Sequence, residues 1–361
     1  MRILFICTSI DSFLKKQIKA LQLSNHQVDI LNIFEYKMIF NNGKKIHIRP
    51  KTKFKIFENF FISDEINEYY RKRELFNYLD SYDIVDIYKC CQYACDIKDK
   101  IETISLKYII TVNEILPRKN SKIDELFKGA KAFFFQNDRV MQSFNYLYGY
   151  SLKSIILYEP IELINIYDNI EQKVYDKFLD YLSISPQKIN IFCHFHGPRH
   201  LQKELIISLA NQPIEIKKIS TFLLYLDNQD SSINSEILLI LKEIKLDYVI
   251  IRPTATNEQI AMLLKASKAS IFINHSPLNS ILITSIYAKN HPFLYKPKEL
   301  DYLFKKEKIF VDNFDEFYFF FEKDEIHKRL LKEIYKRNKQ IIYSLFSFQS
   351  FQERYINETI K

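Results

Sequence analysis

Short apolar runs alternate with amphipathic stretches along most of the chain. Arg2–Cys7 and residues 28–33 are mainly apolar, which is typical of strands buried on both faces of a parallel sheet. Between them, residues 13–23 place Phe, Ile and Leu side chains at helical spacing among lysines. Strand–helix–strand repeats of this length join parallel strands through a helix. The pattern therefore predicts an α/β protein from its first residues.

The alternation of strands and helices occurs twice, which predicts two α/β domains and suits a chain of 361 residues. A polar stretch at residues 165–188 separates the two series, and the second begins with a strand at Ile189–Phe195. In the first series we expect further strands at residues 83–88, 132–136 and 154–158 and at Tyr108–Val112. In the second we expect strands at Ile214–Ile219, 248–252, 269–274 and 292–295, and helices at 201–210, 257–267 and 281–289. We assign residues 1–165 to a first domain, 186–325 to a second, and 326–361 to a charged helical segment.

Composition excludes several classes of protein. Only 4 of 361 residues are glycine and no two are close, so the chain has no glycine-rich dinucleotide, Walker or kinase phosphate loop. Any phosphate must bind at helix N-termini, hydroxyls and basic side chains. The net charge of +8 permits acidic ligands or anionic membranes, but no nucleic-acid-binding module is recognisable. The apolar runs are too short to span a membrane, and five cysteines without framework spacing favour a reducing cytoplasm.

One insertion in the first half alternates basic and apolar residues. Residues 44–57 carry six Lys or Arg residues interspersed with Ile and Phe. One interpretation is an amphipathic hairpin on the first domain whose basic face lies in solvent. The other is a surface that meets anionic headgroups or a lipid-linked substrate. The second interpretation would bring a cytoplasmic protein into peripheral contact with the inner face of the membrane.

Several short motifs in the second half carry a resemblance to a known family. Residues 257–276 form an expected helix followed by a strand that ends in His-Ser, and residues 288–294 read Ala-Lys-Asn-His-Pro-Phe-Leu. These segments resemble family 4 glycosyltransferases. Residues 288–294 correspond to the family pattern Ala-x-Gly-x-Pro-Val-Ile, with Asn290 in place of the glycine. In that family this region holds the nucleotide sugar. Residues 195–203 resemble the family segment whose basic pair meets the diphosphate. Residues 345–348, Leu-Phe-Ser-Phe, are similar to the Phe-Ser-Trp step before the last helix.

The first half carries looser versions of the family's motifs. Residues 81–88 resemble Tyr-Asp-Val-Val-His-x-His, residues 111–114 resemble Thr-x-His-Asp, and residues 132–138 resemble a strand that ends in Gln-Asn/Ser-Glu. The resemblance implies the GT-B fold. In that fold two Rossmann-like domains face each other across a cleft, and a C-terminal helix returns to the first domain. The first domain would take the acceptor and the second the nucleotide sugar.

The resemblance implies a donor site at the strand ends of the second domain. Arg199 and Lys203 would meet the diphosphate. They lie four apart at the start of an expected helix, where the dipole disfavours cations unless an anion is near. Ser280 is a further diphosphate candidate, because a helix N-terminus with spare hydroxyls can bind phosphate without glycine. The simpler interpretation is that Asn279 or Ser280 caps the helix. The candidates for the donor sugar and ribose are Asn279, Thr284, Ser285 and His275.

The chain departs from the family at its acidic residues. The family's second domain carries two glutamates eight positions apart, whereas residues 276–287 contain no acid. Asp86 and Asn113 occupy the histidine positions of the first domain. The candidate bases are Glu114, which directly follows a strand, then Asp86 and Asp11. Asp11 is more simply a helix cap, and Asp86 lies inside a strand, where a structural role is the alternative.

Metal chemistry is the weaker interpretation of the histidines near residue 195. His194 and His196 would share one face of a strand, but His200 lies on the following helix and only Glu204 is an acidic neighbour. We therefore expect no metal. The three cysteines Cys90, Cys91 and Cys95 lack paired zinc-site spacing and are expected to be buried in a helix.

Together these features predict a glycosyltransferase of the hexosyltransferase class that serves cell-envelope polysaccharide synthesis. Its donor would be a nucleotide sugar acting as co-substrate without another cofactor, and its acceptor a glycan or a lipid-linked molecule. No nucleic-acid partner is expected. The missing glutamates leave a second hypothesis, a catalytically inactive scaffold or partner subunit of the same fold. A third is a nucleotide-sugar epimerase of the same architecture, which would need acidic residues that we cannot place.

Overall fold

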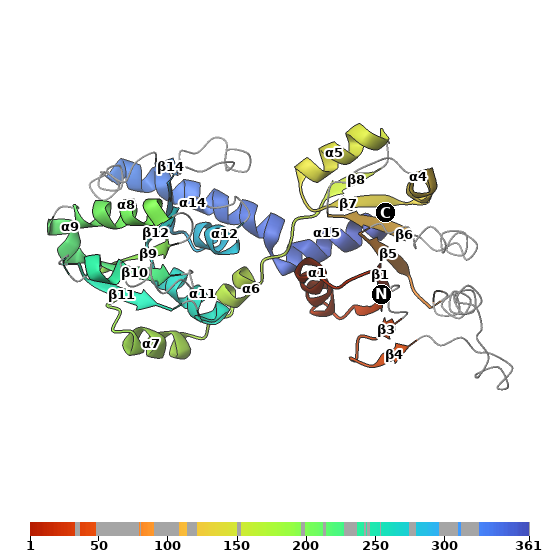
Figure 1. Ribbon diagram of the computed structural model, residues 1–361. Coiled ribbons are helices and arrows are strands. Elements are labelled where there is room, and N and C mark those ends of the chain that lie inside the picture. Colours follow the sequence, from red (N-terminus) through yellow and green to blue (C-terminus); the bar gives the residue numbers. More distant parts are fainter. Residues whose placement is uncertain are drawn as a thin grey trace. The chain divides into compact units, whose positions relative to one another are not determined.

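The computed structural model describes residues 1–32, 37–47, 79, 81–89, 108–113, 121–149, 153–195, 199–211, 214–226, 237–241, 243, 246–252, 254–273, 279–295, 310–311 and 325–360. The chain forms two compact units (Figure 1). The first contains Met1–Pro160 together with Phe348–Lys361, and the second contains Ile161–Ser347.

A sheet of eight strands forms the centre of the first unit, in the order β4-β3-β2-β1-β5-β6-β7-β8. Neighbours from β2 to β8 run parallel, whereas β2, β3 and β4 are antiparallel. The strands are β1 (Arg2–Cys7), β2 (Gln27–Asn32), β3 (Lys37–Ile39), β4 (Lys45–His47), β5 (Ile84–Tyr88), β6 (Tyr108–Val112), β7 (Ala132–Phe135) and β8 (Ser154–Ile156). Every residue of β5, β6 and β7 is buried, because helices cover both faces of a parallel sheet.

Alternate residues of each strand supply two separate cores. On one face, Leu4 and Ile6 pack in a cluster with residues of α4 (Ser121–Gly129) and α5 (Asp138–Tyr148). On the other face, Ile3 and Phe5 pack with α1 (Ser12–Gln22) and the C-terminal helix α15 (Phe348–Ile360). This division follows from the two-residue period of a strand, which points successive side chains to opposite faces.

The C-terminal helix belongs to the first unit, as predicted. Helix α14 (Glu325–Phe346) ends just before Ser347, and α15 starts at the next residue and contacts α1. Tyr355 of α15 is fully buried, with its ring centroid 6.1 Å from that of Phe5 and 5.2 Å from that of Phe134. These aromatic contacts hold α15 on the face of the sheet.

The second unit is built on a parallel sheet with strand order β11-β10-β9-β12-β13-β14. Its strands are β9 (Ile189–Phe195), β10 (Ser220–Leu226), β11 (Tyr248–Ile251), β12 (Ala269–Ile273), β13 (His291–Tyr295) and β14 (Phe310–Val311). Its helices among the described residues are α6 (Glu162–Asp168), α7 (Gln172–Tyr181), α8 (Arg199–Ala210), α9 (Ile214–Ile219), α11 (Asn257–Ala266), α12 (Ser280–Tyr287) and α14. The alternation of strand and helix again produces a parallel sheet covered by helices (Figure 1).

One local prediction was wrong. Ile214–Ile219 was expected to be a strand, but it forms helix α9, and the strand is the following segment Ser220–Leu226. All seven residues of that segment are buried, since β10 is a central strand covered on both faces. The polar stretch at 165–188 contains the end of α6 and all of α7. Leu179 is the buried residue of α7.

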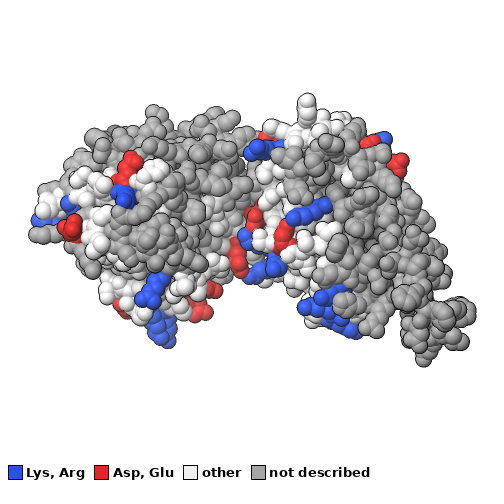
Figure 2. Space-filling model, viewed as in Figure 1, with Lys and Arg blue, Asp and Glu red and all other residues white. Residues whose placement is uncertain are grey.

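The predicted fold class is confirmed: an α/β protein with two parallel Rossmann-like sheets and a C-terminal helix on the first unit. No helix in the described ranges is long and apolar enough to cross a membrane. The basic insertion begins with exposed Lys44, just before edge strand β4, and with exposed Lys45 on that strand. Most of its remainder lies outside the described residues. Figure 2 shows Lys or Arg side chains in blue along the lower edge of the first unit, where Figure 1 places β3 and β4.

Candidate functional site

Three central strands of the first unit end side by side, and each is followed by a polar side chain. Residues Ile6 and Ile87 are paired between β1 and β5, and Tyr88 and Thr111 are paired between β5 and β6. The segments that leave these strands carry Asp11, Lys89 and Asn113, respectively. Because ligands of open α/β sheets gather at the carboxyl ends of parallel strands, this edge is the natural place for a site.

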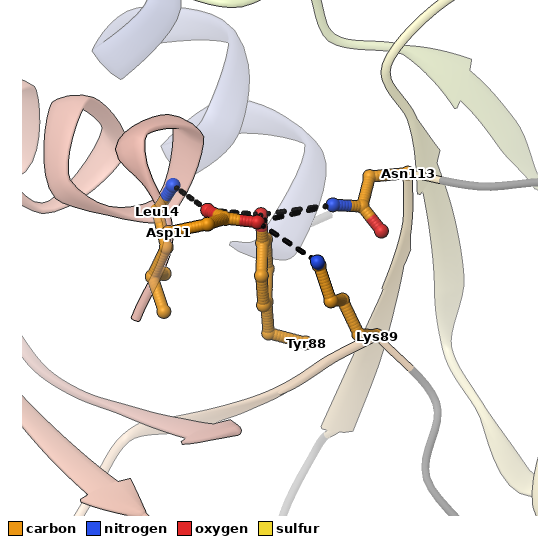
Figure 3. A network of polar contacts seen from close by, with 5 residues as sticks. All are labelled: Asp11, Leu14, Tyr88, Lys89 and Asn113. Atoms are coloured by element: carbon orange, nitrogen blue, oxygen red, sulfur yellow. Dashed lines mark hydrogen bonds and ion pairs between the residues drawn. The ribbon is translucent and has the colours of Figure 1, made fainter. Parts of the chain in front are cut away.

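Asp11 is the centre of a hydrogen-bonded cluster at this edge (Figure 3). It caps helix α1, accepting a hydrogen bond from the backbone N–H of Leu14 at 2.8 Å. The hydroxyl of Tyr88 lies 2.8 Å and 2.9 Å from its two oxygens, and the ammonium of Lys89 lies 3.0 Å from Oδ2. The amide of Asn113 donates to the Tyr88 hydroxyl at 3.0 Å and lies 3.5 Å from Asp11. The helix cap predicted at Asp11 is therefore confirmed, and the same carboxylate also orders three neighbours.

The surroundings of Asp11 keep it ionised. Partial burial would by itself raise the pKa of Asp11, but the hydrogen bonds from Leu14, Tyr88 and Lys89 outweigh burial and lower that pKa. Burial, followed by the neighbouring carboxylate of Asp11, raises the pKa of the Tyr88 hydroxyl. At neutral pH the cluster therefore contains the carboxylate of Asp11, which pairs with Lys89, and a neutral phenol. Lys89 also takes a left-handed backbone conformation, with φ of 63°, which is uncommon for residues other than glycine.

Of the two acids predicted to be catalytic, only Asp86 lies in the described part of the chain. Glu114 directly follows Asn113 but lies outside the described residues. Asp86 lies on β5 and is fully buried, accepting hydrogen bonds from the hydroxyls of Thr111 at 3.0 Å and Tyr355 at 2.8 Å. Burial raises the pKa of Asp86 to about 7 despite these two donors. These contacts favour the structural alternative, and the catalytic role of either acid stays a prediction.

In the second unit, the sheet topology brings the predicted donor segments to one edge. Strands β9 and β12 are parallel neighbours, with His194 paired to Phe272 near their carboxyl ends. Helix α8, which begins at Arg199, follows β9, and helix α12, which begins at Ser280, follows β12. Two helix N-termini therefore follow adjacent strand ends, an arrangement suited to anions.

The N-terminus of α12 is capped by its own side chains. Oδ1 of Asn279 accepts from the backbone N–H groups of Ile281 at 2.9 Å and Leu282 at 3.2 Å, which confirms the predicted cap. Thr284 is buried and donates its hydroxyl to the backbone oxygen of Ser280 at 2.7 Å. Ser285 is also buried, and its hydroxyl has no hydrogen-bond partner in the described part of the chain. Of these residues, Ser280 alone has an exposed side chain.

The other predicted donor residues are described only in part. The side chain of Arg199 and all of His275 lie outside the described residues, and Lys203 on α8 is half-buried. Within the described ranges, no three His, Cys, Asp or Glu side chains gather in a way that could hold a metal. His194 is buried among aromatic rings, 5.1 Å from Tyr225 between centroids. Of the predicted helix cysteines, Cys90, Cys91 and Cys95 are outside the described residues.

Sequence reasoning missed two members of the Asp11 cluster, Tyr88 and Lys89. Tyr88 is the last residue of a buried strand, and Lys89 is the first polar residue after it. A search for polar side chains directly after buried strands would have found Lys89 together with Asn113. Nothing in the sequence indicates that both reach Asp11, because that contact depends on the pairing of β1 with β5.

No protein-family model matches the chain, and no curated protein sequence matches it either. Solved structures do match it over its whole length. A glycosyltransferase from Rickettsia africae ESF-5 has a TM-score of 0.61 at 12% identity, covering 100% of this chain and 98% of that one. Anabaena HepE in complex with UDP has a TM-score of 0.57 at 13% identity, covering 100% and 99%. UDP-GlcNAc 2-epimerase from Neisseria meningitidis, bound to UDP-GlcNAc, has a TM-score of 0.56 at 11% identity and covers 100% of both chains.

At identities this low, the structural likeness establishes the fold. The chain has the GT-B fold, as its resemblance to glycosyltransferases implied. The assignment to family 4 remains a prediction. Because transferases and an epimerase both match, fold alone does not separate these activities.

Proposed function

We propose that this protein is a glycosyltransferase that moves a sugar from a nucleotide sugar to a cell-envelope glycan or a lipid-linked acceptor. The observation that carries the proposal is the polar cluster of Asp11, Tyr88, Lys89 and Asn113 at the carboxyl edge of the first sheet. A fold shared over full length with a glycosyltransferase supports it. Solved relatives of this fold hold UDP and UDP-glucose, which supports a nucleotide-sugar donor.

The second unit would bind the donor. Departure of a nucleoside diphosphate develops negative charge, which an enzyme without a metal must stabilise with cations and helix dipoles. Arg199 and Lys203 would supply the cations from the start of α8, and exposed Ser280 would supply a hydroxyl at the start of α12. Asn279, Thr284, Ser285 and His275 remain the candidates for contacts to the ribose and sugar. Thr284 would contribute through the shape of the site, since its hydroxyl is already bonded to Ser280.

The first unit would bind the acceptor hydroxyl at the Asp11 cluster. Donors already surround both oxygens of Asp11, and its lowered pKa makes it a weak proton acceptor. Asp11 would therefore hold Lys89 and Tyr88 in place for the acceptor. Glu114, the residue after Asn113, would remove the acceptor's proton. In this scheme Asp86 would support the sheet beneath the site from its buried position.

A nucleotide panel tests the donor site. Nucleoside diphosphates and nucleotide sugars that bind the folded chain should raise its melting temperature by mass action. Arg199→Ala should weaken binding by about 1–3 kcal/mol, as expected for a lost charge-assisted hydrogen bond. Lys177→Ala, which removes an exposed cation from α7, is the matched control and should leave binding unchanged. If no nucleotide shifts the melting temperature, the donor site is refuted.

A specific feature favours the inactive scaffold as the second candidate: residues 276–287 contain no acid where the related family has its glutamates. Turnover separates the two. An active enzyme should release free sugar or transfer it from the donor that the panel identifies, and Glu114→Gln should abolish this while leaving the thermal shift intact. Binding without turnover in the unmodified protein would instead support the scaffold. An epimerised nucleotide sugar as the product would identify the epimerase.

A further inference from the structure

A pocket of about 390 Å³ lies on the first unit, away from the Asp11 cluster. Its lining consists of the end of α1, the turn before β2 and the turn between β3 and β4. The lining residues are Gln22, Asn25, His26, Gln27, Phe40, Asn41 and Asn42. Gln27 is the first residue of β2, so the pocket is at the amino edge of the parallel strands. The six-residue strand β2 spans about 17 Å, which separates this edge from the edge that carries Asp11.

The lining is unusually rich in carboxamide side chains. Five of the seven lining residues are Asn or Gln, whereas these two types make up 39 of the 361 residues in the chain. Each carboxamide offers one acceptor oxygen and two N–H donors in a single plane, without charge. The ring of half-buried Phe40 adds an apolar surface beside them. A ligand that fits must therefore both donate and accept hydrogen bonds and must also present an apolar face.

The lining carries no charged side chain at neutral pH. It includes no Lys, Arg, Asp or Glu among the described residues. Partial burial, and then the N-terminal ammonium group, lowers the pKa of His26, whose Nδ1 lies 3.5 Å from the amine of Met1. His26 is therefore a neutral imidazole at pH 7. A site for a phosphate or carboxylate ligand typically contains Arg or Lys, and a site for an amine typically contains a carboxylate.

Hydrogen bonds within the chain join the walls of the pocket. Buried Asp29 accepts the backbone N–H of Asn41 at 2.7 Å and the hydroxyl of Tyr82 at 2.7 Å, which anchors the β3–β4 turn to the sheet. The side-chain amide of Gln22 donates to Oδ1 of Asn41 at 2.7 Å and joins α1 to that turn. Gly43 closes the turn with φ of 79°, and its N–H donates to Phe40 at 2.8 Å. A preformed pocket of this kind loses little entropy when a ligand binds.

We propose that this amide-lined pocket binds uncharged sugar units of a glycan. Sugar hydroxyls donate and accept hydrogen bonds as carboxamides do, and the C–H face of a sugar ring is apolar enough to lie on Phe40. The side-chain amides of Asn25 and Gln27 can bond to such a ligand, because neither has a hydrogen-bond partner in the described part of the chain. The pocket shares no residue with the proposed donor site, and it would hold a glycan at a distance from the Asp11 cluster.

The test uses the full chain on an array of neutral oligosaccharides of hexoses and N-acetylhexosamines, beside sialylated and phosphorylated ones. Neutral glycans should bind, and calorimetry on the best of them should give a dissociation constant. Gln27→Ala should weaken that affinity about fivefold, the effect of one lost hydrogen bond. Gln27→Glu keeps the shape but removes both N–H donors, and it should weaken binding at least as much. Gln142→Ala, an exposed amide on α5, should change nothing.

Three results would overturn the proposal: no binding of any neutral glycan at millimolar concentration, binding of anionic glycans alone, or equal affinity in the wild type and both Gln27 variants. The last result would mean that the glycan binds elsewhere, such as at the acceptor site. Circular dichroism of each variant checks that it is folded. The nucleotide-induced thermal shift should be the same in the Gln27 variants. A flat nucleotide panel with intact glycan binding would thus refute the proposed function and not this pocket.

Discussion

Asp86 should make the stability of the first unit depend on pH. This carboxyl is fully buried on β5, and its hydrogen-bond donors are Thr111 and Tyr355, while its second oxygen, Oδ1, has no partner among the described residues. Burial raises the pKa of Asp86 from its ordinary 3.8 to about 7 in the folded chain. In the unfolded chain the group ionises near its ordinary value. Between these two values the folded state holds a proton that the unfolded state has lost.

The sign and the size of the effect follow from this difference in bound protons. A raised folded pKa stabilises the folded state fully at a pH below 4, and this contribution is lost as the pH rises to about 7. At about 1.4 kcal/mol for each pH unit, the total loss is on the order of 4 kcal/mol. Between pH 5 and pH 8 the expected part is roughly 2–3 kcal/mol. Asp86→Asn removes the ionisable group while keeping an acceptor for Tyr355, so it should remove this part of the pH dependence.

Urea unfolding followed by far-UV circular dichroism at pH 5 and pH 8 measures the difference. Tryptophan fluorescence is no alternative because the chain has no Trp. The free energy of unfolding of Asp86→Asn relative to that of wild type should be roughly 2–3 kcal/mol larger at pH 8 than at pH 5. Tyr355→Phe should lower stability at both pH values by about 1–3 kcal/mol, because it removes a donor and keeps the buried ring. The control Tyr146→Phe changes a side chain that is 90% exposed and should have no effect. Parallel stability curves for wild type and Asp86→Asn would refute the reasoning.

Two further predictions concern the second unit and the basic insertion. Tyr287→Phe removes the hydroxyl that contacts both oxygens of Asp168, at 3.0 Å and 2.7 Å, so it should lower the free energy of unfolding of the second unit by about 1–2 kcal/mol in urea. No change relative to Tyr146→Phe would show that water replaces this contact without loss. For the insertion, we propose attachment to anionic membranes, at roughly 1 kcal/mol for each basic residue near the leaflet. The protein should sediment with anionic liposomes at low salt and less at high salt. A comparison variant changes three lysines of the insertion to Ser, namely Lys51, Lys53 and Lys55. Equal, negligible sedimentation of wild type and this variant would contradict the proposal.

Much of the fold follows from local sequence pattern. Buried strands can be predicted from the sequence, because a strand covered on both faces needs continuous apolar side chains. Examples are Arg2–Cys7, Tyr108–Val112 and Ile189–Phe195. The caps at Asp11 and Asn279 are readable because a capping side chain bonds to N–H groups two or three residues away. These features depend on near neighbours in the chain, so the sequence alone determines them.

Local pattern failed where two signals competed over short distances. At Ile214–Ile219, alternation of Ile with polar residues resembles an exposed-edge strand, yet the segment is a helix. The neighbouring run Ser220–Leu226 takes the central place in the sheet because it buries all seven of its residues against β9 and β11. Packing with distant strands decides which of two adjacent apolar segments enters a sheet. The strand propensity of the residues alone does not predict this choice.

The candidate site was decided by the tertiary structure. Asp11 and Lys89 are 78 positions apart, and they meet because β1 and β5 pair in parallel and end at the same edge. Asp86 and Tyr355 are 269 positions apart, and they meet because α15 returns to the first sheet. The sequence by itself determined the elements, their caps and the class of fold. Strand order and helix return, which balance burial over the whole chain, decided which polar side chains share a site and which are enclosed in the core.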